Sequence, residues 1–430
     1  MKKPTQISAI DIGSSKITTI IASVGEEDQK IRVVGVASVP SKGIRKSQIV
    51  DIEEAIEAVT ESVEAAERMA GFSINNALVS ISGIHIQSLN SKGLVAVQNP
   101  DAEIIADDVA RVVEAAKAVP LDSTREILHV IPRYFIVDNQ EGIKDPVGMS
   151  GVRLEVDAHI ITGSSTNIKN LVKVVSEIGI NTKALVFSGL ASAEAVLTET
   201  EKELGVVLVD LGGGTSSVCI YADGALSHSA VLPVGARNIT NDIAIGLRVN
   251  LDTAEKIKRI LAYEDKTPAK ALDPKNPRAK KHRDEIDLYK LGIKDGPRKI
   301  SRKAVMDGIV KPRLNEILDL IKAEIKKSGL ANQTPAGLVF TGGGALTYNL
   351  QESARRYLGL QARIAIPQKL TGLVDEINTP EYATATGLIL YAVNHELQTP
   401  STVFNLPSLA GFNLSSIGKK LINFVKSFLP

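Results

Sequence analysis

The sequence predicts an α/β protein with two similar lobes, because one short glycine-rich pattern occurs twice, roughly half a chain apart. The first copy is Asp11-Ile-Gly-Ser-Ser-Lys16, and the second is Asp210-Leu-Gly-Gly-Gly-Thr-Ser-Ser217. An apolar run precedes each copy, and apolar alternation resumes after it. This order of strand, small-residue turn and strand is typical of a β-hairpin with a glycine-rich tip.

The composition of the two tips suits an anion. Glycine at positive φ lets backbone N–H groups converge on a phosphate, and serine or threonine hydroxyls add donors without bulk. Asp11 and Asp210 suit a water bound to Mg²⁺, because magnesium keeps several of its waters. Neither copy fits the P-loop pattern or the G-x-G-x-x-G dinucleotide pattern. One copy alone would more often be an ordinary turn, so the predicted phosphate site depends on the pair.

Two further elements extend the pattern. Residues 337–345 form an apolar strand that runs into three glycines, and a helix-like stretch follows over 346–357. Glycines allow the close backbone approach that a flat base needs. Glu255 and Lys258 lie three apart, on one face of a predicted helix, where they can reach a ribose and a base edge. The alternative for that pair is a solvated ion pair on the helix surface.

In the order hairpin, hairpin, Glu-x-x-Lys helix and glycine turn, these elements resemble the actin, Hsp70 and sugar-kinase superfamily. Residues 129–163, 190–205 and 234–244 are similar to characteristic blocks of the bacterial division family FtsA. The resemblance covers nearly the whole chain. It implies an α/β, actin-like two-lobed ATPase fold of duplicated ribonuclease-H-like domains, with an inserted 1C subdomain in place of actin's 1B and a C-terminal amphipathic helix.

The resemblance also implies a site for ATP and Mg²⁺, with the metal held through water by Asp11 and Asp210. Lys16 would face phosphate, although a lysine there could equally point to solvent. The other implied phosphate contacts are Gly13, Ser14, Ser15, Gly212, Gly213, Gly214, Thr215 and, nearby, Gly235. The implied ribose and base contacts are Glu255 and Lys258, and the residues expected behind the adenine are Gly342, Gly343, Gly344 and Ala345.

One position departs from the wider superfamily. Hsp70-like relatives carry a glutamate at the first crossover, where it positions Mg²⁺ and water, and the matching position here is Ser188. A serine cannot act as a carboxylate, and no clear base or water-positioning group replaces it. We therefore expect tight ATP binding with slow hydrolysis, and we name no catalytic residue beyond a water-positioning role for Asp11 and Asp210.

The resemblance divides the chain into subdomains. The stretch 264–302 is rich in lysine, arginine and proline and is expected to be a solvated loop insertion. The expected parts are 1–82, 164–204 and 346–395 for subdomain 1A, 83–163 for 1C, 205–245 and 305–345 for 2A, 246–304 for 2B, 396–413 for a linker and 414–430 for an amphipathic helix.

Composition limits the function. The chain has 430 residues, 44% of them hydrophobic, which is enough for more than one core. A net charge of +1 argues against general nucleic-acid binding. The single cysteine, Cys219, lies in an apolar strand and is expected to be core. We expect no secretory signal and no membrane span, because no run of about eighteen apolar residues occurs.

The pattern of the last residues predicts a membrane-binding helix. Over 414–430 one face is apolar and the other is cationic, which is typical of a helix lying in a membrane interface. The alternative is a terminal helix docked on its own domain, but the preceding proline-containing linker favours the membrane. FtsA proteins end this way. The residues expected to meet an anionic membrane are Ile417, Lys419, Lys420, Leu421, Ile422, Phe424, Val425, Lys426, Phe428 and Leu429.

The resemblance implies an ATP-bound protomer that polymerises under the cytoplasmic face of the bacterial membrane and tethers the division protein FtsZ there. The implied partners are FtsZ, further copies of the chain, anionic lipid and other divisome proteins at the septum. The alternatives are an actin-like adaptor of a pilus or secretion machine, a chaperone-type ATPase, and a small-metabolite kinase. No acidic base facing a substrate is evident for a kinase.

Overall fold

The computed structural model describes residues 5–25, 30–98, 103–263, 284–293, 295–373 and 375–396. Residues up to Ala392 form one compact unit. The membrane-binding helix and all but the first residue of the expected linker lie outside the described residues, as does 264–283 of the basic insertion. Among the described helices, none has the length and apolarity needed to cross a membrane.

The first lobe is built on a six-stranded sheet in the order β11-β6-β1-β2-β3-β19. Its centre is the antiparallel hairpin of β1 and β2, and β6 lies parallel to β1 on the other side. Most residues of β2 are buried, as is β1 beyond its two exposed first residues, with Asp11 partly exposed. The strands are β1 Thr5–Ile12, β2 Lys16–Val24, β3 Ile31–Pro40, β6 Asn76–Ile81, β11 Asn181–Phe187 and β19 Thr371–Gly372.

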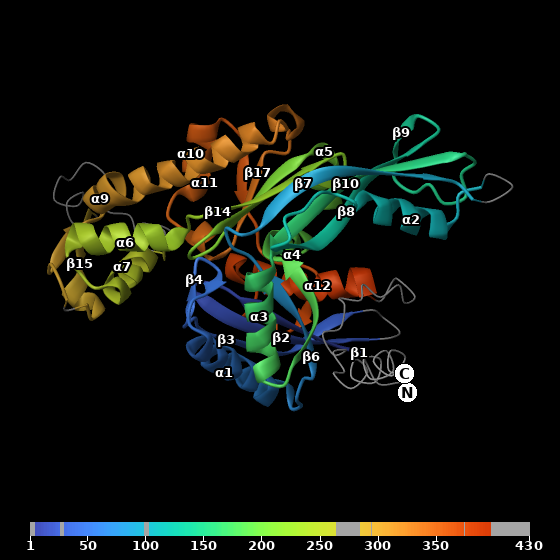
Figure 1. Ribbon diagram of the computed structural model, residues 1–430. Coiled ribbons are helices and arrows are strands. Elements are labelled where there is room, and N and C mark those ends of the chain that lie inside the picture. Colours follow the sequence, from blue (N-terminus) through green and yellow to red (C-terminus); the bar gives the residue numbers. More distant parts are fainter. Residues whose placement is uncertain are drawn as a thin grey trace, which may run out of the picture. The chain divides into compact units, whose positions relative to one another are not determined.

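Helix α1 (Ile52–Ala70) covers one face of this sheet against β2 and β3 (Figure 1). Asp51 caps its first turn by accepting a hydrogen bond from the Glu54 N–H, and Gly71 ends it at φ 81°. The helix approaches β3 closely, because a Cβ at Gly35 would lie 2.5 Å from the Ala66 carbonyl oxygen. Apolar residues spaced for one helical face over 52–70 predict this helix, and the structure confirms it. Helix α3 (Ser165–Glu177) packs beside it.

The second sheet has four strands in the order β7-β10-β8-β9. The sequence pattern indicates a helix near 102–118, and the observed helix α2 (Ala106–Ala116) is shorter. It packs on β7 and β10 over a small apolar core. Gly93 permits this packing, since a Cβ there would lie 2.2 Å from the Val112 oxygen. The strands are β7 Gln87–Ala96, β8 Arg125–Val137, β9 Gln140–Ile143 and β10 Arg153–Ser164.

The second lobe repeats the first. Its sheet has the order β14-β13-β12-β17-β18, with β12 antiparallel to β13 and parallel to β17. This matches β3-β2-β1-β6-β11 strand for strand, which confirms the duplication read from the sequence. Cys219 is fully buried in β13, as expected. The strands are β12 Val206–Leu211, β13 Ser216–Ala222, β14 Ala225–Leu232, β17 Leu338–Thr341 and β18 Ala362–Ile364.

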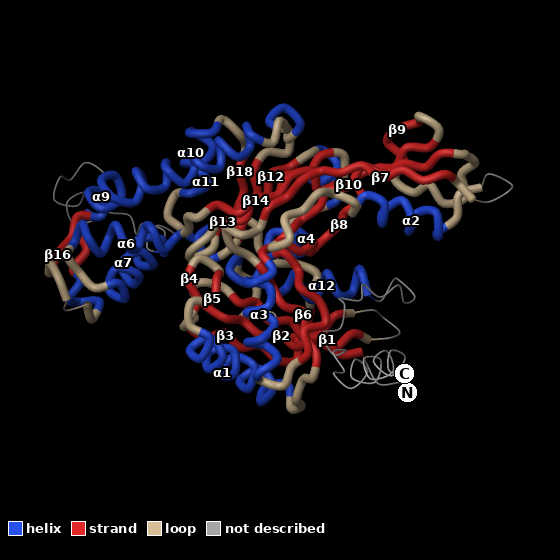
Figure 2. Tube along the Cα trace, viewed as in Figure 1, coloured by secondary structure: helices blue, strands red, loops and turns tan. Residues whose placement is uncertain are grey.

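The second lobe also contains several helices and a small two-stranded sheet, which Figure 2 shows in blue and red. The sequence shows one long amphipathic stretch over 305–326, and in the structure a π-helical turn at Met306–Val310 interrupts this helical stretch before α10. The stretch expected to be helical from residue 346 begins only at Leu350, since Asn349 takes φ 56°. The elements are α6 Ala236–Leu247, α7 Leu251–Tyr263, β15 Glu285–Asp287, β16 Lys299–Ser301, α9 Arg302–Val305, α10 Lys311–Lys327 and α11 Leu350–Leu358.

Two helices lie at the junction of the lobes. Helix α4 (Ser188–Val196) follows β11 of the first sheet and, through the short α5 (Glu199–Leu204), leads into β12 of the second. Helix α12 (Ala383–Glu396) begins with the 3₁₀ turn Pro380–Tyr382. Both helices start next to the glycine-rich hairpins, so the chain crosses between lobes at the place where the sequence predicts the site.

Candidate functional site

The two hairpin tips have the same local structure. In the first, the Gly13 N–H donates to the Lys16 carbonyl at 3.1 Å, and in the second the Gly212 N–H donates to the Thr215 carbonyl at 3.0 Å. A Cβ at Gly13 would lie 2.9 Å from the Lys16 carbonyl oxygen, and a Cβ at Gly212 would lie 2.9 Å from the Thr215 carbonyl oxygen. Each aspartate therefore ends a strand, and each glycine closes the turn that follows it.

The structure brings the two tips into contact. A Cβ at Gly213 would lie 2.8 Å from the Ser15 Cβ, and one at Gly214 would lie 2.8 Å from the Ser14 Oγ. Gly235 joins them at the start of α6, where a Cβ would lie 2.5 Å from the Gly213 oxygen. Residues from three separate parts of the chain thus meet at one glycine-rich junction, where the absence of side chains lets the backbones approach closely.

Asp11 and Asp210 stand at equivalent places and have similar environments. Ser80 Oγ donates to Asp11 at 2.7 Å, and Ser192 Oγ and Thr384 Oγ1 donate to Asp210 at 2.6 and 3.0 Å. Desolvation raises the Asp11 pKa to about 6, and repulsion from Asp210 adds to it against the Ser80 hydrogen bond. Desolvation also raises the Asp210 pKa. Two such carboxyls favour a nearby cation.

Lys16 points into the site rather than to bulk solvent, since its side chain is only 23% exposed. Its Nζ lies 3.7 Å from the Glu381 carboxylate and 3.6 Å from the centre of the Tyr382 ring. Among the described residues, no hydrogen-bond partner satisfies this buried nitrogen. Desolvation lowers the Lys16 pKa, opposed by the charges of Glu381 and Asp11. An ammonium group in this condition fits an anionic ligand such as phosphate.

The glycine turn at 342–344 packs on the second hairpin. Gly342 has φ 80°, and a Cβ there would lie 2.3 Å from Asp210 Oδ1. A Cβ at Gly344 would meet the Leu211 side chain at 2.4 Å, and Ala345 is fully buried. Gly343 is the open member, with Glu381 Cβ nearest at 3.7 Å. Two of the three glycines are therefore required by packing, and Gly343 leaves the surface flat.

The Glu-x-x-Lys pair on α7 contacts the start of α6. Lys258 Nζ donates to Glu255 at 2.7 Å and to Thr240 Oγ1 at 2.9 Å, and Thr240 donates to Glu255 at 2.6 Å. The Lys258 side chain is 14% exposed. The pair is therefore partly enclosed and is linked through α6 to Gly235, rather than being a fully solvated surface pair.

The chain is similar to known proteins over most of its length. The family description "SHS2 domain inserted in FTSA" matches residues 83–162, and "Cell division protein FtsA" matches residues 207–387. The chain is 37% identical to the cell division protein FtsA of Pseudomonas aeruginosa over 91% of this chain and 90% of that protein. The chain belongs to the FtsA family. The FtsA proteins of Escherichia coli and Bacillus subtilis are 34% and 35% identical, over 92% and 94% of this chain and 92% and 87% of theirs.

Solved structures agree on the fold. A chain of the "PilM-PilN type IV pilus biogenesis complex" aligns with a TM-score of 0.60 at 14% identity, over 91% of this chain and 99% of that one. MreB5 of Spiroplasma citri bound to ADP aligns with a TM-score of 0.51 at 13% identity, over 92% and 99%. The FtsA-family chain therefore has the predicted actin-like fold, and its family gives it a role in cell division.

Several residues of this FtsA-family site were not found by sequence reasoning. Short hydroxyl side chains contact both aspartates, and Glu381 and Tyr382 hold Lys16. Ser188, where a glutamate would stand in Hsp70-like relatives, bonds to Ser217 at 3.0 Å. Single serines and threonines carry no motif signal, and they come together only because β6 ends, and α4 and α12 begin, at the same place.

Proposed function

We propose that the chain binds ATP with Mg²⁺ where the two hairpin tips meet. The observation that carries this proposal is the ammonium group of Lys16, which is buried beside the two glycine-rich tips. In the described part of the chain, the Lys16 Nζ has no hydrogen-bond partner. The phosphates would contact the two tips and Gly235, and Mg²⁺ would be held through water by Asp11 and Asp210. The metal would supply charge neutralisation between the phosphates and the two carboxyls.

Hydrolysis at this site is expected to be slow. Ser188 stands where a glutamate would position water, and its hydroxyl is bonded to Ser217. Asp11 and Asp210 each accept from serine or threonine hydroxyls, which suits water positioning around a metal better than proton abstraction. The nucleotide then acts mainly as a ligand that favours one arrangement of the lobes.

Membership of the FtsA family, with its role in cell division, supports the rest of the proposed function. The ATP-bound protomer polymerises on the cytoplasmic face of the cell membrane at the septum and tethers FtsZ filaments there with other divisome proteins. Its anchor is the cationic amphipathic segment 414–430. Each lysine near an anionic surface contributes about 1 kcal/mol, so one tail binds weakly. Polymerisation links many tails and raises the overall avidity by orders of magnitude.

FtsZ is proposed to bind the outer part of the second lobe. A groove of about 270 Å³ lies there, formed mostly by apolar side chains of α6, α9, the π-helical turn and β16. Its members include Leu247, Ile300 and Ile309, with Lys299 among the polar ones. An apolar groove with a cationic member suits a short peptide with apolar and acidic residues.

The test is electron microscopy of the full-length chain on lipid monolayers, with and without ATP. We expect filaments only when nucleotide, anionic lipid and the tail are all present. A chain lacking residues 415–430 should lose sedimentation with anionic vesicles while keeping ATP binding. Filaments that form equally without nucleotide, or vesicle binding that survives the deletion, would contradict the proposal. Phosphate transfer from ATP to a small metabolite would favour the kinase alternative.

A further inference from the structure

The short hairpin between β3 and α1 lies at the proposed nucleotide site but is not part of the duplicated pattern. It consists of β4 (Ile44–Arg45) and β5 (Gln48–Ile49), joined by Lys46 and Ser47. In the second lobe β14 ends at Leu232, and α6 begins at Ala236, with no hairpin between them. The Lys46–Ser47 turn is therefore an addition to the first lobe only.

The backbone of this turn is strained. Lys46 has φ 49° and Ser47 has φ 57°, so two consecutive residues with side chains occupy the left-handed region that favours glycine. Conformations of this kind persist when their surroundings hold them, and they cluster at binding and switch sites. Here hydrogen bonds at the base of the hairpin hold the turn in this conformation. Val50 and Asp51 both donate their N–H groups to the Gly43 carbonyl, and Asp51 also caps α1.

Ser47 contacts both phosphate tips at once. Its N–H donates to Ser14 Oγ of the first tip at 2.7 Å, and its hydroxyl lies 2.9 Å from Thr215 Oγ1 of the second tip. The neighbouring Lys46 backbone is close to the second tip, since a Cβ at Gly214 would lie 3.3 Å from the Lys46 Cα. The turn thus lies where groups from the two lobes meet, and it presents two donors and one exposed lysine there.

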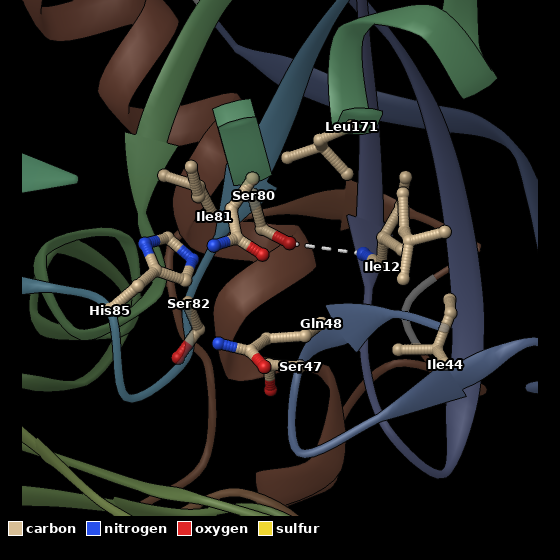
Figure 3. A pocket seen from close by; sticks show the side chains of 11 residues that line it. Ile12, Ile44, Ser47, Gln48, Ser80, Ile81, Ser82, His85 and Leu171 are labelled. Carbon is tan, nitrogen blue, oxygen red and sulfur yellow. Dashed lines mark hydrogen bonds between the residues drawn. The ribbon is translucent and has the colours of Figure 1, made fainter. Parts of the chain in front are cut away.

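A small polar cavity lies behind the turn. Its volume is about 10 Å³, about the size that holds one water, and Figure 3 shows Ser47 and Gln48 facing Ser80 and Ser82 across it. Ser80 also accepts from the Ile12 N–H and donates to Asp11. The turn therefore shares its surroundings with the carboxyl that is proposed to hold the Mg²⁺ water.

We propose that the Lys46–Ser47 turn is a third phosphate-contacting element, which recognises the terminal phosphate of ATP. The Ser47 N–H and hydroxyl exchange Ser14 and Thr215 for phosphate oxygens, and the Lys46 ammonium adds charge. Because Ser47 touches both tips, it lies where a phosphate bound by both tips would be. The strained turn holds the Ser47 donors in position before the ligand binds. The inference rests on the proposed ATP site and adds to it a way to distinguish ATP from ADP.

The first test compares ATP and ADP affinities of the full-length chain with fluorescent analogues. Ser47→Ala and Ser47→Gly remove the hydroxyl, and loss of one hydrogen bond to a charged phosphate should weaken ATP binding about tenfold while ADP binding changes little. Ser47→Gly also relieves the strained φ, so its melting temperature should not fall. Asp223→Gly is the matched control, because Asp223 has φ 54° in the β13–β14 turn, away from the tips.

The second test uses charge. Lys46→Gln should weaken ATP binding more than ADP binding, whereas Lys42→Gln, which removes an exposed lysine from the same loop, should change neither. A lower melting temperature in Ser47→Ala with an unchanged ratio of ATP to ADP affinity would make Ser47 a structural bridge only and would overturn the inference. Failure of the unaltered chain to bind either nucleotide would instead overturn the proposed function.

Discussion

Gly387 of α12 lies directly against the main-chain carbonyl of Ala191 of α4. A Cβ at Gly387 would be 1.8 Å from the Ala191 oxygen, so the two helices can cross at this distance only without a side chain there. Helix α4 leads from the first sheet toward the second, and α12 packs on it at the junction of the lobes. Both also contact the second hairpin, through Ser192 and Thr384 on Asp210. The crossing therefore fixes the lobes and the site together.

Gly387→Ala should destabilise the chain. The backbone oxygen cannot move aside as a flexible side chain would, so overpacking is expected to lower the free energy of unfolding by about 1–3 kcal/mol. Chemical denaturation measures the change. Gly308→Ala is the control, because a Cβ at Gly308 meets nothing within 4 Å and its φ is not positive. Equal stability of the two variants would show that α12 shifts freely over α4.

Asp11 gives a pH-dependent prediction. Its folded pKa is about 6, above the ordinary value of 3.8, so its contribution to stability is fully present below pH 3.8 and is lost as the pH rises through 6. Asp11→Asn should therefore raise the free energy of unfolding at pH 7, by roughly 1–3 kcal/mol, and leave it nearly unchanged below pH 4. Denaturation at several pH values without nucleotide measures this difference.

The same variant should lose a metal effect. If Asp11 holds the water of Mg²⁺, adding Mg²⁺ with ATP should raise the melting temperature of the unaltered chain more than that of Asp11→Asn. Glu352→Gln, on the exposed side of α11, removes one acidic group away from the site and should respond as the unaltered chain does. An Asp11→Asn chain with an undiminished Mg²⁺ response would place the metal elsewhere.

The duplicated hairpins could be predicted from the sequence, because glycine and serine tips between apolar runs are local signals. The sequence placed the two tips around one phosphate site, but the direct approach of Gly213 to Ser15 is seen only in the structure. Ser47 could not be predicted in the same way. Its neighbours Ser14 and Thr215 are 33 and 168 residues away in the chain, and nothing in the local pattern around it distinguishes it from an ordinary turn.

The helix boundaries indicated by the sequence differ from the observed ones because of local backbone conformations. Apolar periodicity continues through 305–326, so it could not reveal the π-helical turn at Met306–Val310. Asn349 takes a left-handed φ of 56°, which delays the start of α11, and asparagine tolerates that conformation without being required for it. Periodicity records which face of a segment is buried, whereas these interruptions depend on how the segment packs in three dimensions.

His159 gives a pH dependence of the opposite sign. It lies where β10 meets β14, with Asn90 Oδ1 at 2.6 Å and Ser229 Oγ at 2.9 Å from its ring nitrogens. Its pKa is lowered to about 3, mainly by burial, with smaller contributions from the neighbouring His228, Arg133 and His129. Its neutral form stabilises the fold above the ordinary pKa of 6.5, and that stability is lost as the pH falls toward 3.

His159→Gln should remove this acid sensitivity. A glutamine keeps a polar side chain without a proton to gain, so the free energy of unfolding should fall less steeply between pH 6.5 and 4 than in the unaltered chain. His395→Gln, at an exposed position near the end of α12, serves as the control. Parallel pH profiles for all three chains would contradict a neutral His159 in the contact between the four-stranded sheet and the second lobe.

Glu381 is expected to compete with phosphate for Lys16. In Glu381→Gln the ammonium loses its nearest carboxylate, at 3.7 Å, and keeps the Tyr382 ring, so more of its charge is available to a ligand. ATP affinity should rise a few-fold in this variant, whereas Lys16→Ala should lower it by about tenfold or more. The double variant should bind like Lys16→Ala alone, because Glu381 then has no lysine to withhold. Additive effects in the double variant would mean that Glu381 repels the nucleotide directly and does not act through Lys16.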